Sequence, residues 1–230
     1  MRTAFLALTA AALLGAGSAQ AANLIVVEAR AIALKPGATI DGTKPLVLKQ
    51  GQHVTLISEA GATLSIDGPY NQPPSAGGSG KSIGATLAAL GTERNARTGE
   101  AGVTRDLTKT KLPEPWLFDV THSGSVCLQE GAQPVFWRPK ADTASAIVIM
   151  PVDRSWKSRA DWPMGRDRMM VTTDVPVHGG AAYVVNYGGA DYALAVATVP
   201  ASLANDDMRA AWMVQKGCEA QAEALLRPRK

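Results

Sequence analysis

The pattern of apolar and polar residues predicts a chain made mainly of short β-strands. The chain contains short runs that are rich in β-branched residues and bounded by Gly, Pro and Asp turn residues, and in 53–58 and 62–66 the apolar residues Val54, Leu56, Leu64 and Ile66 alternate with polar neighbours. The runs are 24–29, 45–49, 53–58 and 62–66, and then 116–120, 125–128, 134–138, 145–150, 168–173, 181–187 and 192–199. A period of two predicts sheets with one buried face.

The segment 202–226 has a different period and is predicted to be helical. Its apolar residues recur at spacings of three and four, with Trp212 as the largest, so they lie on one face of a helix. Asn205 or Asp206 can cap its start. Gly217 weakens the helix and favours a break into two shorter ones. We expect the helix to close the β-domain that precedes it.

These elements divide the chain into a signal segment and three further parts. Residues 22–70 form a small β domain, and residues 71–115 form a Gly- and Pro-rich linker with one short helix. Residues 116–230 form a β-rich domain with the helix 202–226 at its end. The predicted fold class is mainly β (α+β), with an antiparallel β-sandwich or barrel-like domain closed by the helix.

Residues 1–21 have the features of a secretory signal peptide. An early Arg2 is followed by an apolar core and then by small residues that end in Ala19-Gln20-Ala21. The apolar run is about half of the roughly 20 residues that a membrane-spanning helix needs. We therefore expect cleavage before Ala22, a periplasmic or secreted product, and no transmembrane segment after cleavage.

The two cysteines, Cys127 and Cys218, are expected to form a structural disulfide. An even count in an exported chain favours pairing. The alternatives are a catalytic thiol or a metal ligand, but neither cysteine has a Cys or His neighbour at ligand spacing.

The charge balance argues against a nucleic-acid partner. The chain has 23 Lys and Arg against 20 Asp and Glu, a formal net charge of +3. Nucleic-acid binding needs a strong basic surplus, which this sequence lacks. The 22 glycines and 14 prolines suit a turn-rich β protein.

Residues 33–70 follow the order of strand, glycine turn, strand, glycine turn, strand and Gly-Pro, as in LVLKQGQHVTLISEAGATLSIDGP. This segment resembles the small β-rich periplasmic domain of FecR-type regulators and of related exported proteobacterial proteins of unknown function. The resemblance implies a β-rich exported domain. It does not carry over the regulatory role, because the chain shows neither the transmembrane helix nor the cytoplasmic anti-sigma segment of that family.

Motifs for catalysis, cofactors and metals are incomplete. Gly80-Lys81-Ser82 matches the end of a phosphate-binding loop, but Ser75 stands where that loop needs glycine, so a flexible linker explains it. His122 and Ser125 lie near Cys127, yet a turn entering a strand explains them equally. His53 and His178 stand far away in sequence. We expect no catalytic residues, no metal site and no cofactor.

The stretch 154–168 is the one that mixes charges with tryptophans. Trp156, Arg159, Trp162 and Arg166 could stack on rings and take up anionic groups, so they are the candidate binding residues. The alternative is that the tryptophans point into the core and the charges only solvate a loop.

The leading hypothesis is an exported, non-enzymatic binding or structural module of the cell envelope, whose partner is an envelope protein, glycan or lipid headgroup. The second is an envelope-acting hydrolase or transferase whose site the sequence does not reveal. Spatial convergence of a histidine with an acid and a nucleophile would favour the second hypothesis. The sequence makes no prediction of oligomeric state.

Overall fold

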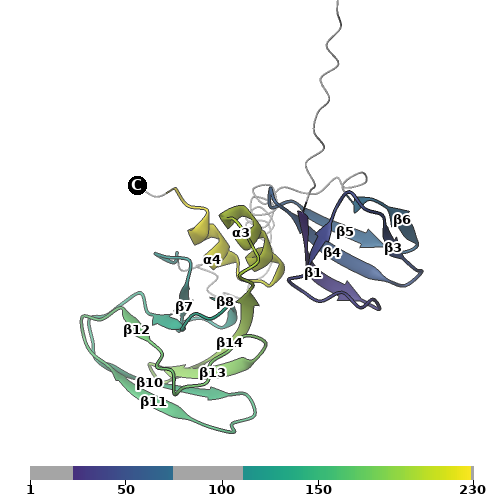
Figure 1. The fold of residues 1–230 in the computed structure, drawn as a ribbon. Coiled ribbons are helices and arrows are strands. Elements are labelled where there is room, and N and C mark those ends of the chain that lie inside the picture. The colour runs from purple at the N-terminus through teal and green to yellow at the C-terminus, as the bar shows by residue number, and fades with distance from the viewer. Residues whose placement is uncertain (1–22, 75–110, 229–230) are drawn as a thin grey trace, which may run out of the picture.

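The computed structural model describes residues 23–74 and 111–228, which form two β-sandwiches with a helix pair between them (Figure 1). The prediction of a mainly β fold with C-terminal helices is confirmed. No sheet within these two ranges closes into a barrel. The predicted signal peptide 1–21 and the linker segment 75–110, with Gly80-Lys81-Ser82, lie outside the described residues.

The first sandwich contains six short strands. They are β1 (Asn23–Arg30), β2 (Thr39–Asp41), β3 (Leu46–Leu48), β4 (His53–Ser58), β5 (Thr63–Asp67) and β6 (Tyr70–Gln72). A four-stranded antiparallel sheet in the order β2-β1-β4-β5 faces the pair β3-β6. The core between them includes Leu48, Leu56 and Leu64.

Strand β1 is buried on both faces, which explains its continuous apolar run. Leu24 and Val26 point into the core of the first sandwich. Ile25 and Val27, which alternate with them, join a second core that also contains the C-terminal helices. The pairing of β1 with β4 shifts register between Val26 and Glu28. Val27 is thus the extra residue of a β-bulge.

The second sandwich contains eight strands. They are β7 (Leu117–Asp119), β8 (Gly124–Gln129), β9 (Val135–Trp137), β10 (Ser145–Pro151), β11 (Ser158–Trp162), β12 (Arg168–Met170), β13 (Ala182–Tyr187) and β14 (Ala190–Val199). A five-stranded sheet in the order β11-β10-β13-β14-β8 packs on a three-stranded sheet in the order β12-β9-β7.

The sheets of the second sandwich are mixed, whereas the strand pattern in the sequence predicted an antiparallel sandwich. Strand β14 runs parallel to β8, and β7 runs parallel to β9. The physical reason is that neither pair is joined by a tight hairpin, which would force an antiparallel arrangement.

The predicted C-terminal helix is two helices, α3 (Asp206–Gln215) and α4 (Glu219–Leu225). The Asn205 side chain caps α3 by accepting the N–H of Met208 at 2.9 Å. The break falls at Gly217, as the sequence predicted. Its φ of +79° is a left-handed conformation that glycine adopts readily.

The helix pair packs against both sandwiches, whereas the sequence pattern predicted that it closes the second one alone. Ile25 and Ile57 of the first sheet and Val199 of the second sandwich share one core with Trp212 and Leu225 of the helices. Figure 1 shows α3 and α4 between the two sandwiches. The helix pair therefore holds the two β units together.

Strand β8, at one edge of the five-stranded sheet, is fastened to α4. Cys127 forms a disulfide with Cys218, with an S–S distance of 2.09 Å. The Gln221 side chain accepts the Cys127 N–H at 2.6 Å and donates to the Cys127 carbonyl at 2.9 Å. The sequence pointed to the disulfide but not to Gln221.

Candidate functional site

The outer face of the five-stranded sheet presents a half-buried apolar strip. Ile147 and Ile149 of β10 point into the sandwich core. Their neighbours Val148 and Met150 therefore point outward, and Met150 lies opposite Val184 of β13. This strip of side chains is the floor of the candidate site.

A depression of about 380 Å³ lies over this floor. Its lining residues are Met150, Arg154, Trp156, Lys157, Val184 and Asp191. One half-buried indole, two cations and one carboxylate thus surround two apolar side chains. A small number of polar groups around an apolar floor is typical of ligand sites.

The loop between β10 and β11 is ordered by its own hydrogen bonds. The Arg154 N–H donates to the Pro151 carbonyl at 2.9 Å, and the Ser155 N–H donates to Asp153 Oδ1 at 3.0 Å. The Ser155 backbone and side chain lower the pKa of Asp153. Arg154 has a φ of +58°, which is uncommon outside glycine and concentrates at functional positions.

Trp156 joins the depression to the core. Its ring packs against Tyr183, with 6.0 Å between centroids, and the residue also lines the depression. An aromatic ring held by the core can present a rigid contact surface at low cost in conformational entropy.

Charges of opposite sign flank the apolar floor. Arg159 of β11 lies opposite Val148, so it shares the outer face, and its side chain is 66 % exposed. Asp191 of β14 lies on the other side, where its carboxylate accepts from Asn186 Nδ2 at 2.7 Å. Of the residues that line the depression, the cations Arg154 and Lys157 precede β11 and the carboxylate Asp191 lies on the β14 side, whereas Arg159 on β11 shares the outer face with Asp161, 4.0 Å away.

The structure separates the four binding residues that the sequence proposed. Trp156 and Arg159 belong to the outer face. Trp162 is fully buried, because alternate residues of β11 face inward, and its predicted surface role is wrong. Arg166 is exposed in the turn after β11. Met150, Val184 and Asp191 were missed, because strand register brings them to the site.

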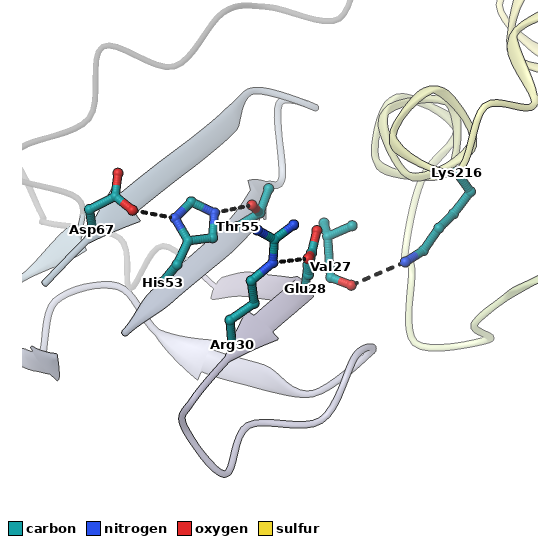
Figure 2. A network of polar contacts seen from close by, with 7 residues as sticks. All are labelled: Val27, Glu28, Arg30, His53, Thr55, Asp67 and Lys216. Atoms are coloured by element: carbon teal, nitrogen blue, oxygen red, sulfur yellow. Dashed lines mark hydrogen bonds and ion pairs between the residues drawn. The ribbon is translucent and has the colours of Figure 1, made fainter. Parts of the chain in front are cut away.

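One histidine does meet an acid and a hydroxyl group. Figure 2 shows His53 between Asp67 and Thr55, with Nδ1 2.7 Å from Asp67 Oδ1 and Nε2 3.1 Å from Thr55 Oγ1. A nucleophilic triad has the same order of groups. However, Thr55 is only 6 % exposed, so a substrate has little access to its hydroxyl. We therefore interpret Asp67, His53 and Thr55 as a row of hydrogen-bonded side chains on the sheet rather than as a nucleophilic triad.

The other two histidines lie on separate elements. His122 Nδ1 lies 2.9 Å from Asp119 Oδ2 and also 2.9 Å from Thr121 Oγ1. His178 contacts the Gly179 carbonyl at 3.2 Å through Nδ1. The histidines therefore do not assemble a common site.

The polar row beside His53 reaches the end of α3. Arg30 Nε donates to Glu28 Oε1 at 2.6 Å, and this bond is the largest cause that lowers the pKa of Glu28. Lys216 Nζ donates to the carbonyl of the bulged Val27 at 3.3 Å (Figure 2). These contacts lie where the first sheet meets the helix pair.

Metal and membrane signatures are absent from the described ranges. No cluster of three His, Cys, Asp or Glu residues there is arranged to bind a metal ion. No helix within 23–74 or 111–228 has the length and apolar character to cross a membrane. Comparisons with protein families, curated proteins and solved structures gave no match to this chain.

Proposed function

We propose that the protein is an exported, non-enzymatic binding module of the cell envelope, and that its ligand occupies the depression at Trp156. The observation that carries the proposal is the half-buried indole beside Arg154 and Lys157 over the floor of Met150 and Val184. The signal-like residues 1–21 support export. A disulfide is also more typical of oxidising compartments than of the cytosol.

The chemistry of the site favours an anionic envelope component. Guanidinium and ammonium groups pair with carboxylate or phosphate oxygens. The indole face of Trp156 offers a flat surface to a ring or an apolar group. The carboxylate of Asp191 repels a ligand that carries negative charge along its whole length. It therefore favours a ligand whose negative charge lies at one end.

Calorimetric titration of the chain without residues 1–21 tests the binding proposal. The probes are soluble peptidoglycan fragments and vesicles that contain phosphatidylglycerol. We expect one probe to bind, with an affinity that falls as salt rises because exposed ion pairs are screened. Trp156→Ala and Lys157→Ala should each weaken binding by about tenfold or more.

Lys140→Ala is the matched control, because Lys140 is exposed and does not line the depression. It should bind like the wild type. Equal binding by Trp156→Ala and the wild type would refute the assigned site. Failure of both probes to bind would count against an anionic envelope ligand.

Export has its own test. Amino-terminal sequencing of the protein recovered from the periplasm or medium of the expressing cells should begin at Ala22. Recovery in the cytosol with Met1 intact would refute export, whatever the binding experiment shows.

A further inference from the structure

The two edge strands of the five-stranded sheet differ in whether their outer backbone groups are paired. At the β8 edge, Gln221 takes up both backbone groups of Cys127. At the opposite edge, β11 pairs with β10 alone. Within the described ranges, no helix or loop forms hydrogen bonds with the backbone of 158–162 from its open side. A strand with an open side presents unpaired N–H and C=O groups to another chain.

Exposed methionines lie next to this open edge. Met164 lies two residues after the end of β11 and is 68 % exposed, and Met170 of β12 is 67 % exposed. Met170 lines a cavity of about 190 Å³ together with Ser158 and Ala160 of β11. These residues place apolar surface beside the unpaired backbone, and exposed apolar patches mark interaction sites.

The charges on β11 are symmetric about its middle residue. Arg159 and Asp161 flank Ala160, and both point to the outer face of the sheet. Their side chains are 66 % and 91 % exposed, and their mutual contact is a long 4.0 Å. Each charged group therefore has room to accept a second partner.

We propose that β11 is a dimerisation edge that binds β11 of a second copy of this chain. The two strands run antiparallel with a twofold axis at Ala160, so that the two five-stranded sheets become one. Arg159 of each copy then lies opposite Asp161 of the other, and both ion pairs form at once. A twofold interface requires this kind of self-complementarity.

The backbone permits this register. Along a strand, the N–H and C=O groups of every second residue point to the same edge. Two residues at equal distances before and after Ala160 are an even number of positions apart, so their backbone groups point to the same edge of β11. The donors of one copy therefore meet the acceptors of the other, whichever residues face the open side. Pro163 has no N–H and ends the paired segment.

The same charges select against other pairings. A parallel, in-register arrangement would place Arg159 beside Arg159 and Asp161 beside Asp161. Like charges directly opposite each other are destabilising, whereas opposite charges stabilise neighbouring strands. The inference does not depend on the proposed ligand, because the dimer needs none of the residues that line the depression; Arg159 shares the outer face but does not line it.

Sedimentation equilibrium of the chain without residues 1–21 tests the proposal. The wild type should show a concentration-dependent dimer. Arg159→Asp places two like-charged pairs at the interface, and so does Asp161→Arg, so each should raise the dimer dissociation constant by about tenfold or more. The double variant R159D/D161R restores opposite charges and should dimerise like the wild type.

A mixture of the two single variants gives the sharpest result. Arg159→Asp carries two acids on β11 and Asp161→Arg carries two bases, so the mixture should form a heterodimer although neither variant dimerises well alone. Arg166→Asp, an exposed charge reversal outside β11, is the matched control and should dimerise like the wild type.

Three results would overturn the proposal. They are a wild type that stays monomeric at millimolar concentration, single variants that dimerise as well as the wild type, and a mixture that fails to associate. Hydrogen exchange of the β11 amides gives a second measurement, because amides at the open edge should gain protection as the protein concentration rises.

Discussion

The guanidinium of Arg138 lies over the indole of Trp162, with its central carbon 4.8 Å from the ring centroid, and both residues are fully buried. Arg138 donates to the Pro163 carbonyl at 2.7 Å, to the Arg166 carbonyl at 3.0 Å and to the Tyr187 hydroxyl at 3.3 Å. No carboxylate of the described residues pairs with it. This buried cation therefore fixes the turn after β11 to the core.

Arg138→Met should destabilise the protein by about 2 to 5 kcal/mol. The Arg166 carbonyl loses its donor and the Pro163 carbonyl keeps only the N–H of Arg166 at 3.4 Å, and a hydrogen bond to a charged group contributes about 1.5 to 3 kcal/mol. Urea denaturation measures the change. Lys140→Met, an exposed cation two residues away, should stay within about 0.5 kcal/mol of the wild type. Equal stability of the two variants would contradict the role of Arg138.

Gln221→Met should cost about 2 to 4 kcal/mol, because it leaves the N–H and C=O of Cys127 unpaired in a buried position. The amide of Cys127 should also exchange faster with deuterium. Gln215 ends the neighbouring helix α3 and is exposed, so Gln215→Met is the matched control. Unchanged exchange at Cys127 would mean that Gln221 does not protect the β8 edge.

Reduction of the disulfide should lower the free energy of unfolding. Cys127 and Cys218 are 91 residues apart, and the chain-entropy model gives an upper limit of about 4 to 5 kcal/mol for a loop of that length. Urea denaturation with and without reductant measures the loss, and the double variant C127A/C218A should show no reductant effect. A wild type insensitive to complete reduction would disagree with this expectation.

Acid should destabilise the fold through four surface carboxylates. Hydrogen bonds lower the pKa of Glu28, Asp41, Asp153 and Asp174, with Arg30 supplying the largest contribution at Glu28. A lowered folded-state pKa stabilises the protein above the unfolded pKa of about 4 to 4.5, and this stability is lost as the pH falls through the folded value. Denaturation between pH 6 and 2 should show this decline.

Arg30→Met tests the contribution of Glu28 to that decline. It removes the main cause of the lowered pKa at Glu28, so stability should fall less steeply with acid than in the wild type. Lys35→Met is the control, since it removes an exposed cation that makes no such contact with Glu28. An identical slope for wild type and Arg30→Met would contradict the assignment.

Local periodicity located most strands but missed three. In 53–58 the polar residues His53 and Thr55 alternate with Val54 and Leu56, and 145–150 is a short apolar run rich in β-branched residues; β4 and β10 occupy these segments. Strands β2 and β6 have three residues each, too few to display a period. Strand β11 consists of Ser158–Trp162, whose small and charged residues have low β propensity. Its pairing with β10, a tertiary contact, decides its conformation.

The residues of the candidate site could also be predicted only in part from the sequence. Trp156 and Arg159 were accessible to sequence reasoning because the charges and tryptophans are adjacent in the chain. Whether an indole faces the core depends on register, which sequence alone leaves open, and Trp162 faces inward. Asp191 joins the site through the pairing of β14 with β13, more than thirty residues along the chain.

The shared core has a consequence for the order of folding. Ile25 lies near the start of the described chain and Leu225 near its end, yet both belong to one cluster. Closing such a long loop is entropically costly and slows folding. Strand β1 is made early, but its second apolar face stays uncovered until the last helices have been synthesised. A chain that stops before α3 should therefore leave the apolar face of Ile25 and Val27 exposed on β1 and aggregate.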